Sequence, residues 1–191
     1  ASTRQAPAAM KAPLAAACLA LALACPASFA AGNRPATDVK PTPAPESDHF
    51  QSKDGFNALL LITDDAQWED EWNTPAEHVP HFTQAHHVKV GGELHILSFL
   101  FNPQVDADGM ANVACDLLVT RPDGSASVDE KGEVCLKAHV DGDPHNMYLS
   151  ASTLKFISRP GDLKGTYHVR IVMRDVNRGV ALTLEDSFVN E

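Results

Sequence analysis

Apolar and polar residues alternate along the C-terminal part of the chain. Between residues 166 and 174 the apolar positions are Tyr167, Val169, Ile171 and Met173, and the residues between them are mostly polar. A period of two is typical of a β-strand with one face in a core and one face in water. After a turn at residues 177–179 the alternation resumes over residues 180–184. The pattern therefore predicts an antiparallel hairpin.

Short apolar or alternating runs, separated by turn signals that include 121–124 and 131–132, continue back to about residue 55. We expect strands at residues 58–63, 93–101, 112–120, 125–128, 134–140, 147–150 and 154–158. The first two runs are almost entirely apolar, which indicates a strand buried on both faces at 58–63 and a central strand at 93–101. With about eight or nine strands and no amphipathic helix longer than one turn, the chain is predicted to form an all-β antiparallel sandwich.

The segment 64–86 interrupts this pattern, because it is long and lacks strand alternation. It contains Trp68, Trp72 and Phe82 among acidic residues. The two Trp residues are four positions apart, so one helical turn would place both rings on the same side. Exposed aromatic rings in a loop are typical anchors of a recognition surface, and we therefore predict a binding site here. The alternative is that the rings cap one end of the core, since large rings are mostly buried.

The N-terminal region indicates export. From Met10, the expected start, a basic residue precedes an apolar run over 12–24, and small residues end the segment near Ala30. This pattern predicts a signal peptide within 1–30, with residues 1–9 as an upstream extension, and the run is too short to span a bilayer. We expect cleavage near Ala30 rather than lipidation at Cys25, because Cys25 follows an imperfect lipid-attachment motif. Residues 31–53, rich in Pro, are expected to be a flexible linker before a domain over 54–191.

Net charge limits the classes of partner that the protein can bind, and cysteine content indicates its cellular compartment. Without residues 1–30 the chain has 13 basic and 25 acidic residues, a net charge of −12. This charge disfavours nucleic acid and anionic membranes as partners. Removal of the signal peptide leaves Cys115 and Cys135, which we expect to form a disulfide in an oxidising compartment such as the periplasm or the extracellular space.

Two sets of residues are candidates for metal binding. His78, His81, His86 and His87 lie within ten residues, with Glu77 beside them, and clustered imidazoles bind zinc or copper. The alternative is a polar loop that is rich in His. The loop at 105–109 has an Asp-x-Asp-Gly sequence, but its twelfth position is not the Glu that a calcium loop requires, so a turn is favoured.

The sequence carries no signature of nucleophilic catalysis. There is no Gly-x-Ser-x-Gly motif, and both remaining cysteines are expected to be oxidised. We therefore predict a protein that is not an enzyme and has no cofactor, zinc or copper binding being the alternative.

A Pro-Gly-Asp turn at 160–162 is followed by Gly165-x-Tyr167-x-Val169, and a second turn has the sequence Arg-Pro-Asp-Gly at 121–124. With these motifs the region 55–191 resembles immunoglobulin-like and fibronectin-like modules of secreted bacterial proteins. The overall arrangement of the chain also resembles that of small envelope proteins of proteobacteria. The resemblance implies a tyrosine corner, in which the Tyr167 hydroxyl bonds to upstream backbone. Val169 stands where antibody domains have a cysteine, so the expected disulfide should link neighbouring strands within one sheet or at a sheet edge, and not join the two sheets. These motifs are specific for the fold and say almost nothing about function. Because catalytic signatures are absent, we expect an exported, non-catalytic binding module of the envelope whose partner is an envelope protein or a small ligand.

Overall fold

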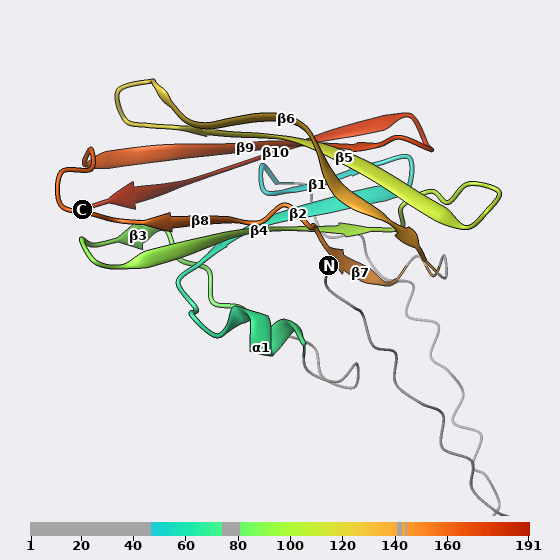
Figure 1. Ribbon diagram of the computed structural model, residues 1–191, viewed down its shortest axis with the longest axis horizontal. Coiled ribbons are helices and arrows are strands. Elements are labelled where there is room, and N and C mark those ends of the chain that lie inside the picture. The colour runs from blue at the N-terminus through green and yellow to red at the C-terminus, as the bar shows by residue number, and fades with distance from the viewer. Residues whose placement is uncertain (1–46, 74–80, 141–142, 144) are drawn as a thin grey trace, which may run out of the picture. The chain divides into compact units, whose positions relative to one another are not determined.

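Ten β-strands and one short helix make up the part of the chain that the structure describes. This computed structural model describes residues 47–73, 81–140, 143 and 145–191. The expected signal peptide and residues 31–46 of the expected linker lie outside the described residues. The strands form two sheets that face each other in a sandwich (Figure 1). No helix within the described ranges is long and apolar enough to cross a membrane.

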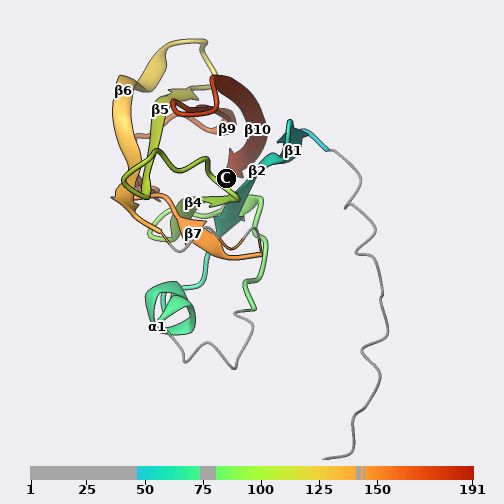
Figure 2. The ribbon, with the colours of Figure 1, turned by 90° about the vertical axis from the view of Figure 1, so that its right-hand side faces the viewer.

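The first sheet is antiparallel throughout and is centred on β4, as its apolar sequence predicts. Its strands are β1 (Phe50–Lys53), β2 (Phe56–Thr63), β4 (Glu93–Phe101), β7 (Met147–Leu149) and β8 (Leu154–Ile157). β4 pairs with β2 on one side, and β7 and β8 pair in succession with its other side. The helix α1 (Trp68–Trp72) lies outside this sheet, on the face away from the second sheet (Figure 2).

The second sheet has the order β3-β10-β9-β5-β6. Its strands are β3 (His87–Val88), β5 (Met110–Thr120), β6 (Ala126–His139), β9 (Gly165–Asp175) and β10 (Val180–Asn190). All pairs are antiparallel except β3 with β10. β5, β9 and β10 have the chain order and pairing of strands C, F and G of the immunoglobulin fold, and β4, in the other sheet, takes the place of strand B. The fold is an immunoglobulin-like β-sandwich.

The main core lies between the two sheets. The inward row of β2 includes Phe56 and Leu60, and it belongs to the same buried cluster as Ile171 of β9 and Leu184 of β10. Inward and outward residues alternate in β9 and over most of β10, so the predicted hairpin is confirmed. Burial of these apolar side chains contributes roughly 25 cal/mol per Å² removed from water and is the main force that holds the sheets together.

Tyr167 forms the expected tyrosine corner. Its hydroxyl donates a hydrogen bond to the Leu163 carbonyl at 3.1 Å, and its ring stacks on Phe188 with the ring centroids 5.2 Å apart. Burial raises the pKa of the Tyr167 phenol. The same carbonyl also accepts a bond from the Asn190 amide at 3.0 Å, so the corner ties the turn before β9 to the end of β10.

The sandwich begins before residue 54, earlier than the Pro-rich composition suggested. Phe50–Lys53, inside the range expected to be linker, form β1, with Phe50 opposite Leu59 of β2. Asp54 and Gly55 connect the two strands, with φ values of 50° and 83°. Positive φ at both central residues is the geometry that an Asp-Gly hairpin turn supplies, because it matches the twist of the strands.

The expected turn at 131–132 is wrong, because β6 runs through it as one continuous strand. The pairing of β6 with β5 shifts register in this region, and Gly132 takes the bulged position with φ 69°. The Gly132 N–H donates to Asp116 Oδ1 at 2.9 Å, which satisfies the backbone group that the bulge leaves unpaired. A turn and a bulge both favour glycine, so the local sequence did not distinguish them.

The disulfide joins Cys115 of β5 to Cys135 of β6, with their Cα atoms 5.8 Å apart. The two strands are neighbours in the second sheet, so the bridge lies within one sheet, as expected. Both residues are fully buried. The bridge therefore fixes β6, an edge strand, onto β5.

Candidate functional site

The segment 64–73 forms the predicted single helical turn. At its start the Asp65 carboxylate accepts the N–H of Gln67 at 2.8 Å, and three acidic residues in the first turn favour the positive end of the helix dipole. At its end the Asn73 amide group donates to the Glu69 carbonyl at 2.7 Å. These contacts stabilise the helical turn, and packing against Leu97 and Phe99 places both Trp rings on the outer face of β4.

Trp68 belongs to a second, smaller core. It is 7% exposed and packs with Leu97 and Phe99 of β4. Its indole N–H donates to Nδ1 of His95 at 2.9 Å, and Nε2 of His95 lies 3.3 Å from a Glu93 oxygen. Because His95 accepts at Nδ1, its neutral form carries the proton on Nε2, which donates to Glu93. For Trp68 the alternative role as a structural cap is the one that its burial supports.

The Glu93 carboxylate ends this chain of hydrogen bonds. Lys155 of β8 lies 2.7 Å from it, and the hydrogen bond from Lys155 lowers the pKa of Glu93. Sequence reasoning missed His95. Its signal was an imidazole within the mostly apolar run of 93–101. His95 alternates with Leu97 and Phe99, so it shares the outer face of β4, on which the Trp rings pack.

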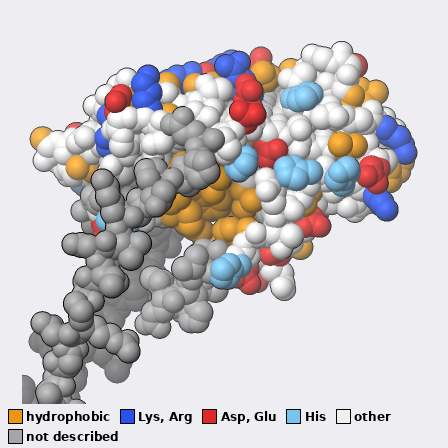
Figure 3. Space-filling model, turned by 180° about the vertical axis from the view of Figure 1, so that it is seen from behind, with side chains coloured by type: hydrophobic (Ala, Val, Ile, Leu, Met, Phe, Trp, Pro, Cys, Tyr) orange, Lys and Arg blue, Asp and Glu red, His pale blue; other side chains and the backbone are white. Residues whose placement is uncertain are grey.

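Trp72 and Phe82 lie at the margin of the same small core. Their ring centroids are 5.3 and 5.7 Å from that of Phe99, and both residues are half-buried. Around them lie further half-buried apolar side chains of the first sheet. We call this set the outer apolar face; it consists of Leu59, Leu61, Phe101, Met147, Leu149, Trp72 and Phe82. Figure 3 shows hydrophobic side chains gathered in one area of the molecule, with acidic and His side chains beside it.

The predicted histidine cluster is only partly described. His78 and Glu77 lie outside the described residues, and His81 is exposed. His86 Nδ1 lies 3.0 Å from the Ser187 carbonyl, whereas His87 Nδ1 lies 2.8 Å from a Glu191 carboxylate oxygen. The His86 imidazole therefore engages β10, whereas the His87 imidazole engages the residue that follows this strand. Among the residues with described positions, no three His, Cys, Asp or Glu side chains are grouped so that they could hold a metal ion.

The calcium-loop candidate is a turn. The Asp106 carboxylate accepts the N–H groups of Asp108 and Met110, both at 2.9 Å. It therefore closes its own loop, as the Asp and Gly composition favoured.

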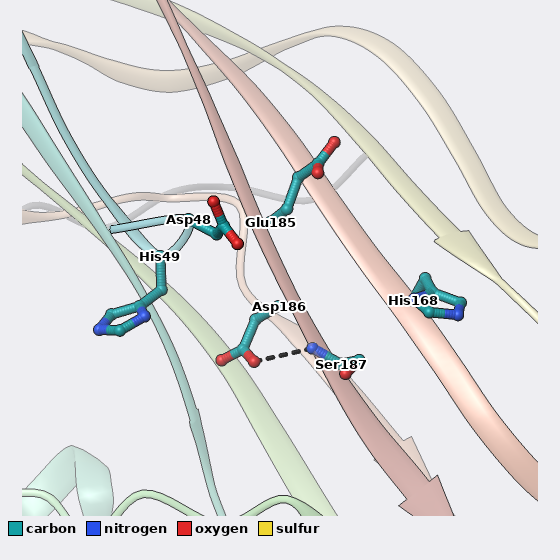
Figure 4. Close-up of a pocket in the computed structure, with 6 residues that line it drawn as sticks. All are labelled: Asp48, His49, His168, Glu185, Asp186 and Ser187. Carbon is teal, nitrogen blue, oxygen red and sulfur yellow. Dashed lines mark hydrogen bonds between the residues drawn. The ribbon is translucent and has the colours of Figure 1, made fainter. Parts of the chain in front are cut away.

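A polar cleft that the sequence analysis did not predict lies between the start of β1 and the edge of β10. It has a volume of about 340 Å³ and is lined by Asp48, His49, His168, Glu185, Asp186 and Ser187 (Figure 4). Three of the six lining residues are acidic and none is Lys or Arg. The cleft is therefore suited to a positively charged group.

Asp186 is the residue that distinguishes this cleft. It occupies the inward row of β10 between Leu184 and Phe188, and its side chain is 12% exposed. Oδ1 accepts the Ser187 N–H at 2.7 Å, while Oδ2 is buried and has no hydrogen-bond partner in the described structure. The signal in the sequence was an acidic residue at an apolar position of the alternating pattern.

Comparison with known proteins does not show a family for this chain. No family model and no curated protein matches the sequence. Among solved structures, a family 123 glycoside hydrolase from Clostridium perfringens is similar with a TM-score of 0.39 and 9% identity, over 70% of this chain and 27% of that one. A Niemann-Pick type C2 protein from the Japanese carpenter ant is similar with a TM-score of 0.38 and 13% identity, over 74% of this chain and 91% of that one. Similarity this low carries no inference about activity or ligand.

Proposed function

We propose that this protein is an exported, non-catalytic β-sandwich that binds a partner in the bacterial envelope through the outer apolar face. The observation that carries the proposal is that the first sheet is apolar on both sides. Its inner side forms the main core, and the outer side of an antiparallel sheet is ordinarily polar. Here the outer side presents five half-buried apolar side chains, and Trp72 of α1 and Phe82 pack beside them.

Burial distinguishes the residues that hold this surface together from those that can contact a partner. Trp68, Leu97 and Phe99 are buried and hold α1 in place. Trp72 and Phe82 rest on Phe99 and keep part of each ring accessible. Half-exposed aromatic rings over a rigid apolar floor are the arrangement that supplies binding energy at protein interfaces, and contiguous exposed apolar area marks interaction sites.

The test compares partner capture from envelope extract by the wild type and by the double variant Trp72→Ala/Phe82→Ala. The matched control is Val134→Ala, which removes an apolar side chain that is 53% exposed on β6 of the other sheet. We expect the double variant to lose the captured partner and the control to keep it, with both retaining cooperative unfolding. Equal capture by all three proteins would contradict the proposed binding surface.

Export is tested on the same material. The mass of the protein isolated from the periplasm or the medium should correspond to a chain that begins after Ala30. A cytoplasmic protein with intact residues 10–30 would contradict export, and a diacylated N-terminus at Cys25 would show a membrane-anchored form instead.

A further inference from the structure

The outer apolar face is bordered by acidic residues on the side of α1. Five of the eight residues from Asp64 to Glu71 are acidic, and α1 has no basic residue in its last turn. Asp64, Glu69 and Asp70 are exposed. Within the described structure, none of these three carboxylates takes part in an ion pair. Because Trp68 and Trp72 fix α1 to β4, these charges stay beside the apolar side chains.

A second acidic region lies where the start of β1 meets β10 of the second sheet. Asp48 lies two residues before Phe50, which is opposite Leu59 of the outer apolar face. With Glu185 and Asp186, Asp48 lines the polar cleft, whose lining contains no Lys or Arg. The two acidic regions differ in origin, one on a helix and one on a strand edge, and only the region on α1 borders the outer apolar face.

We infer that the outer apolar face takes a cationic amphipathic peptide segment, in which Lys or Arg side chains alternate with apolar ones. This inference rests on the proposed function and names the class of its partner. Apolar side chains of the segment cover the outer apolar face, and the basic side chains reach the carboxylates of Glu69 and Asp70 at its border. Charge complementarity of this kind sets partner choice and association rate more than total affinity.

The same charges argue against other occupants. An anionic membrane or a nucleic acid would bring phosphates against the exposed carboxylates of α1, and like charges held close together oppose association. An acidic or neutral apolar segment would cover the outer apolar face but would bring no positive charge to the carboxylates of Glu69 and Asp70. The basic amphipathic segment is the one that satisfies both the apolar and the charged parts of the surface.

The test uses two short synthetic peptides, one alternating Leu and Lys and the other alternating Leu and Glu, titrated into the mature protein by calorimetry. We expect the Lys peptide to bind at least about tenfold more tightly than the Glu peptide. Added salt should reduce this difference in affinity, because it screens the electrostatic interaction between the peptide and the carboxylates. Trp72→Ala/Phe82→Ala should weaken binding of the Lys peptide as well.

The charge of α1 is tested with Glu69→Gln/Asp70→Asn, and the matched control is Glu130→Gln/Glu133→Gln on exposed positions of β6. Each neutralises two carboxylates on the surface, so neither is expected to unfold the protein. We expect the α1 variant to bind the Lys peptide roughly threefold to tenfold more weakly and the β6 variant to bind it as the wild type does. An equal effect of both variants would overturn the inference, because it would show attraction by net charge alone.

Failure of the inference and failure of the proposed function give different results. If the Lys and Glu peptides bind equally and Trp72→Ala/Phe82→Ala weakens both, the outer apolar face binds but its partner is not cationic. If the Lys peptide binds and Trp72→Ala/Phe82→Ala has no effect, the inference is overturned, since the contact lies elsewhere. If neither peptide binds, the inference is overturned and the capture experiment decides the proposed function separately.

Discussion

Replacement of Asp175 by Ala should destabilise the domain more than any other single change considered for this protein. Asp175 is fully buried at the end of β9. Oδ2 accepts the Gln104 N–H at 2.7 Å and the Arg178 Nε–H at 3.2 Å, and Oδ1 accepts the Arg178 backbone N–H at 3.1 Å. The Arg178 guanidinium also donates hydrogen bonds to the backbone carbonyl oxygens of Asp54 and Asn102. The pair therefore ties the β9–β10 turn of one sheet to two turns of the other.

The magnitude follows from what the substitution leaves behind. Asp175→Ala removes three hydrogen bonds and leaves Arg178, whose side chain is 18% exposed, without its counter-charge. Removal of one partner from a buried ion pair costs roughly 3–5 kcal/mol, because the remaining charge stays desolvated. Asp175→Asn should cost about 2 kcal/mol, since an amide cannot accept at both positions where N–H groups now point.

The assay is urea denaturation of the oxidised protein, with the free energy of unfolding taken from the midpoint at constant slope. The matched control is Asp186→Asn, at the other acidic position of the inward rows of this hairpin. Asp186 Oδ2 has no partner within the described residues, and Oδ1 has only the Ser187 N–H and the exposed His86 ring at 3.5 Å. An Asn side chain keeps an oxygen for the Ser187 N–H, so Asp186→Asn above the titration range of His should leave stability unchanged or raise it by up to about 1 kcal/mol. If Asp175→Ala lowers the free energy of unfolding by less than about 1 kcal/mol, the reasoning is refuted. It is refuted also if Asp175→Asn and Asp186→Asn lower this free energy equally, because hydrogen-bond and ion-pair partners would then not decide how much each acid contributes to stability.

Three further predictions concern other contacts. Tyr167→Phe should lower the free energy of unfolding by about 0.5–1.5 kcal/mol, because the carbonyl that it leaves keeps a second donor; an unchanged denaturation midpoint would contradict the tyrosine corner. The Arg174 guanidinium lowers the pKa of Asp116 from 3.8 to about 2, so this pair stabilises the fold above about pH 4 and the gain disappears as the pH falls through 2. The stability difference between the wild type and Arg174→Gln should therefore shrink over that range, and a constant difference would contradict the assignment. Alkylation without reductant should leave Cys115 and Cys135 unlabelled, whereas two labelled thiols would contradict the disulfide.

The sequence determined most of the strands and their faces, since these depend on a local repeat; β1 and the continuity of β6 were not predicted. The alternation of Tyr167, Val169 and Ile171 is visible within one strand, and the pleat of the backbone turns it directly into an inner and an outer face. The disulfide could be predicted for a related reason. Two cysteines remained after the expected cleavage, and they stood on neighbouring strands, within bonding distance once those strands paired.

Tertiary structure decided which residues of the interrupted segment are support and which are surface. Spacing put Trp68 and Trp72 on the same side of one helical turn, but the path of the chain over β4 decided that Trp68 would be buried against His95 and Trp72 left half-exposed. The spacing of four residues is the same whether the helix rests on a sheet or in solvent, so no local pattern distinguishes these outcomes.

The same limit applies to the acids and glycines. Asp175 and Asp186 are both carboxylates at inward positions, and only the partners brought from distant turns make one an anchor and leave the other with an unpaired oxygen. Gly132 is a bulge rather than a turn because Asp116, on the neighbouring strand, receives its N–H. The sequence by itself determined the fold class and most of the strands. The pairing of distant polar groups was decided only by tertiary structure, because burial and hydrogen bonding depend on the residues that pack opposite each side chain.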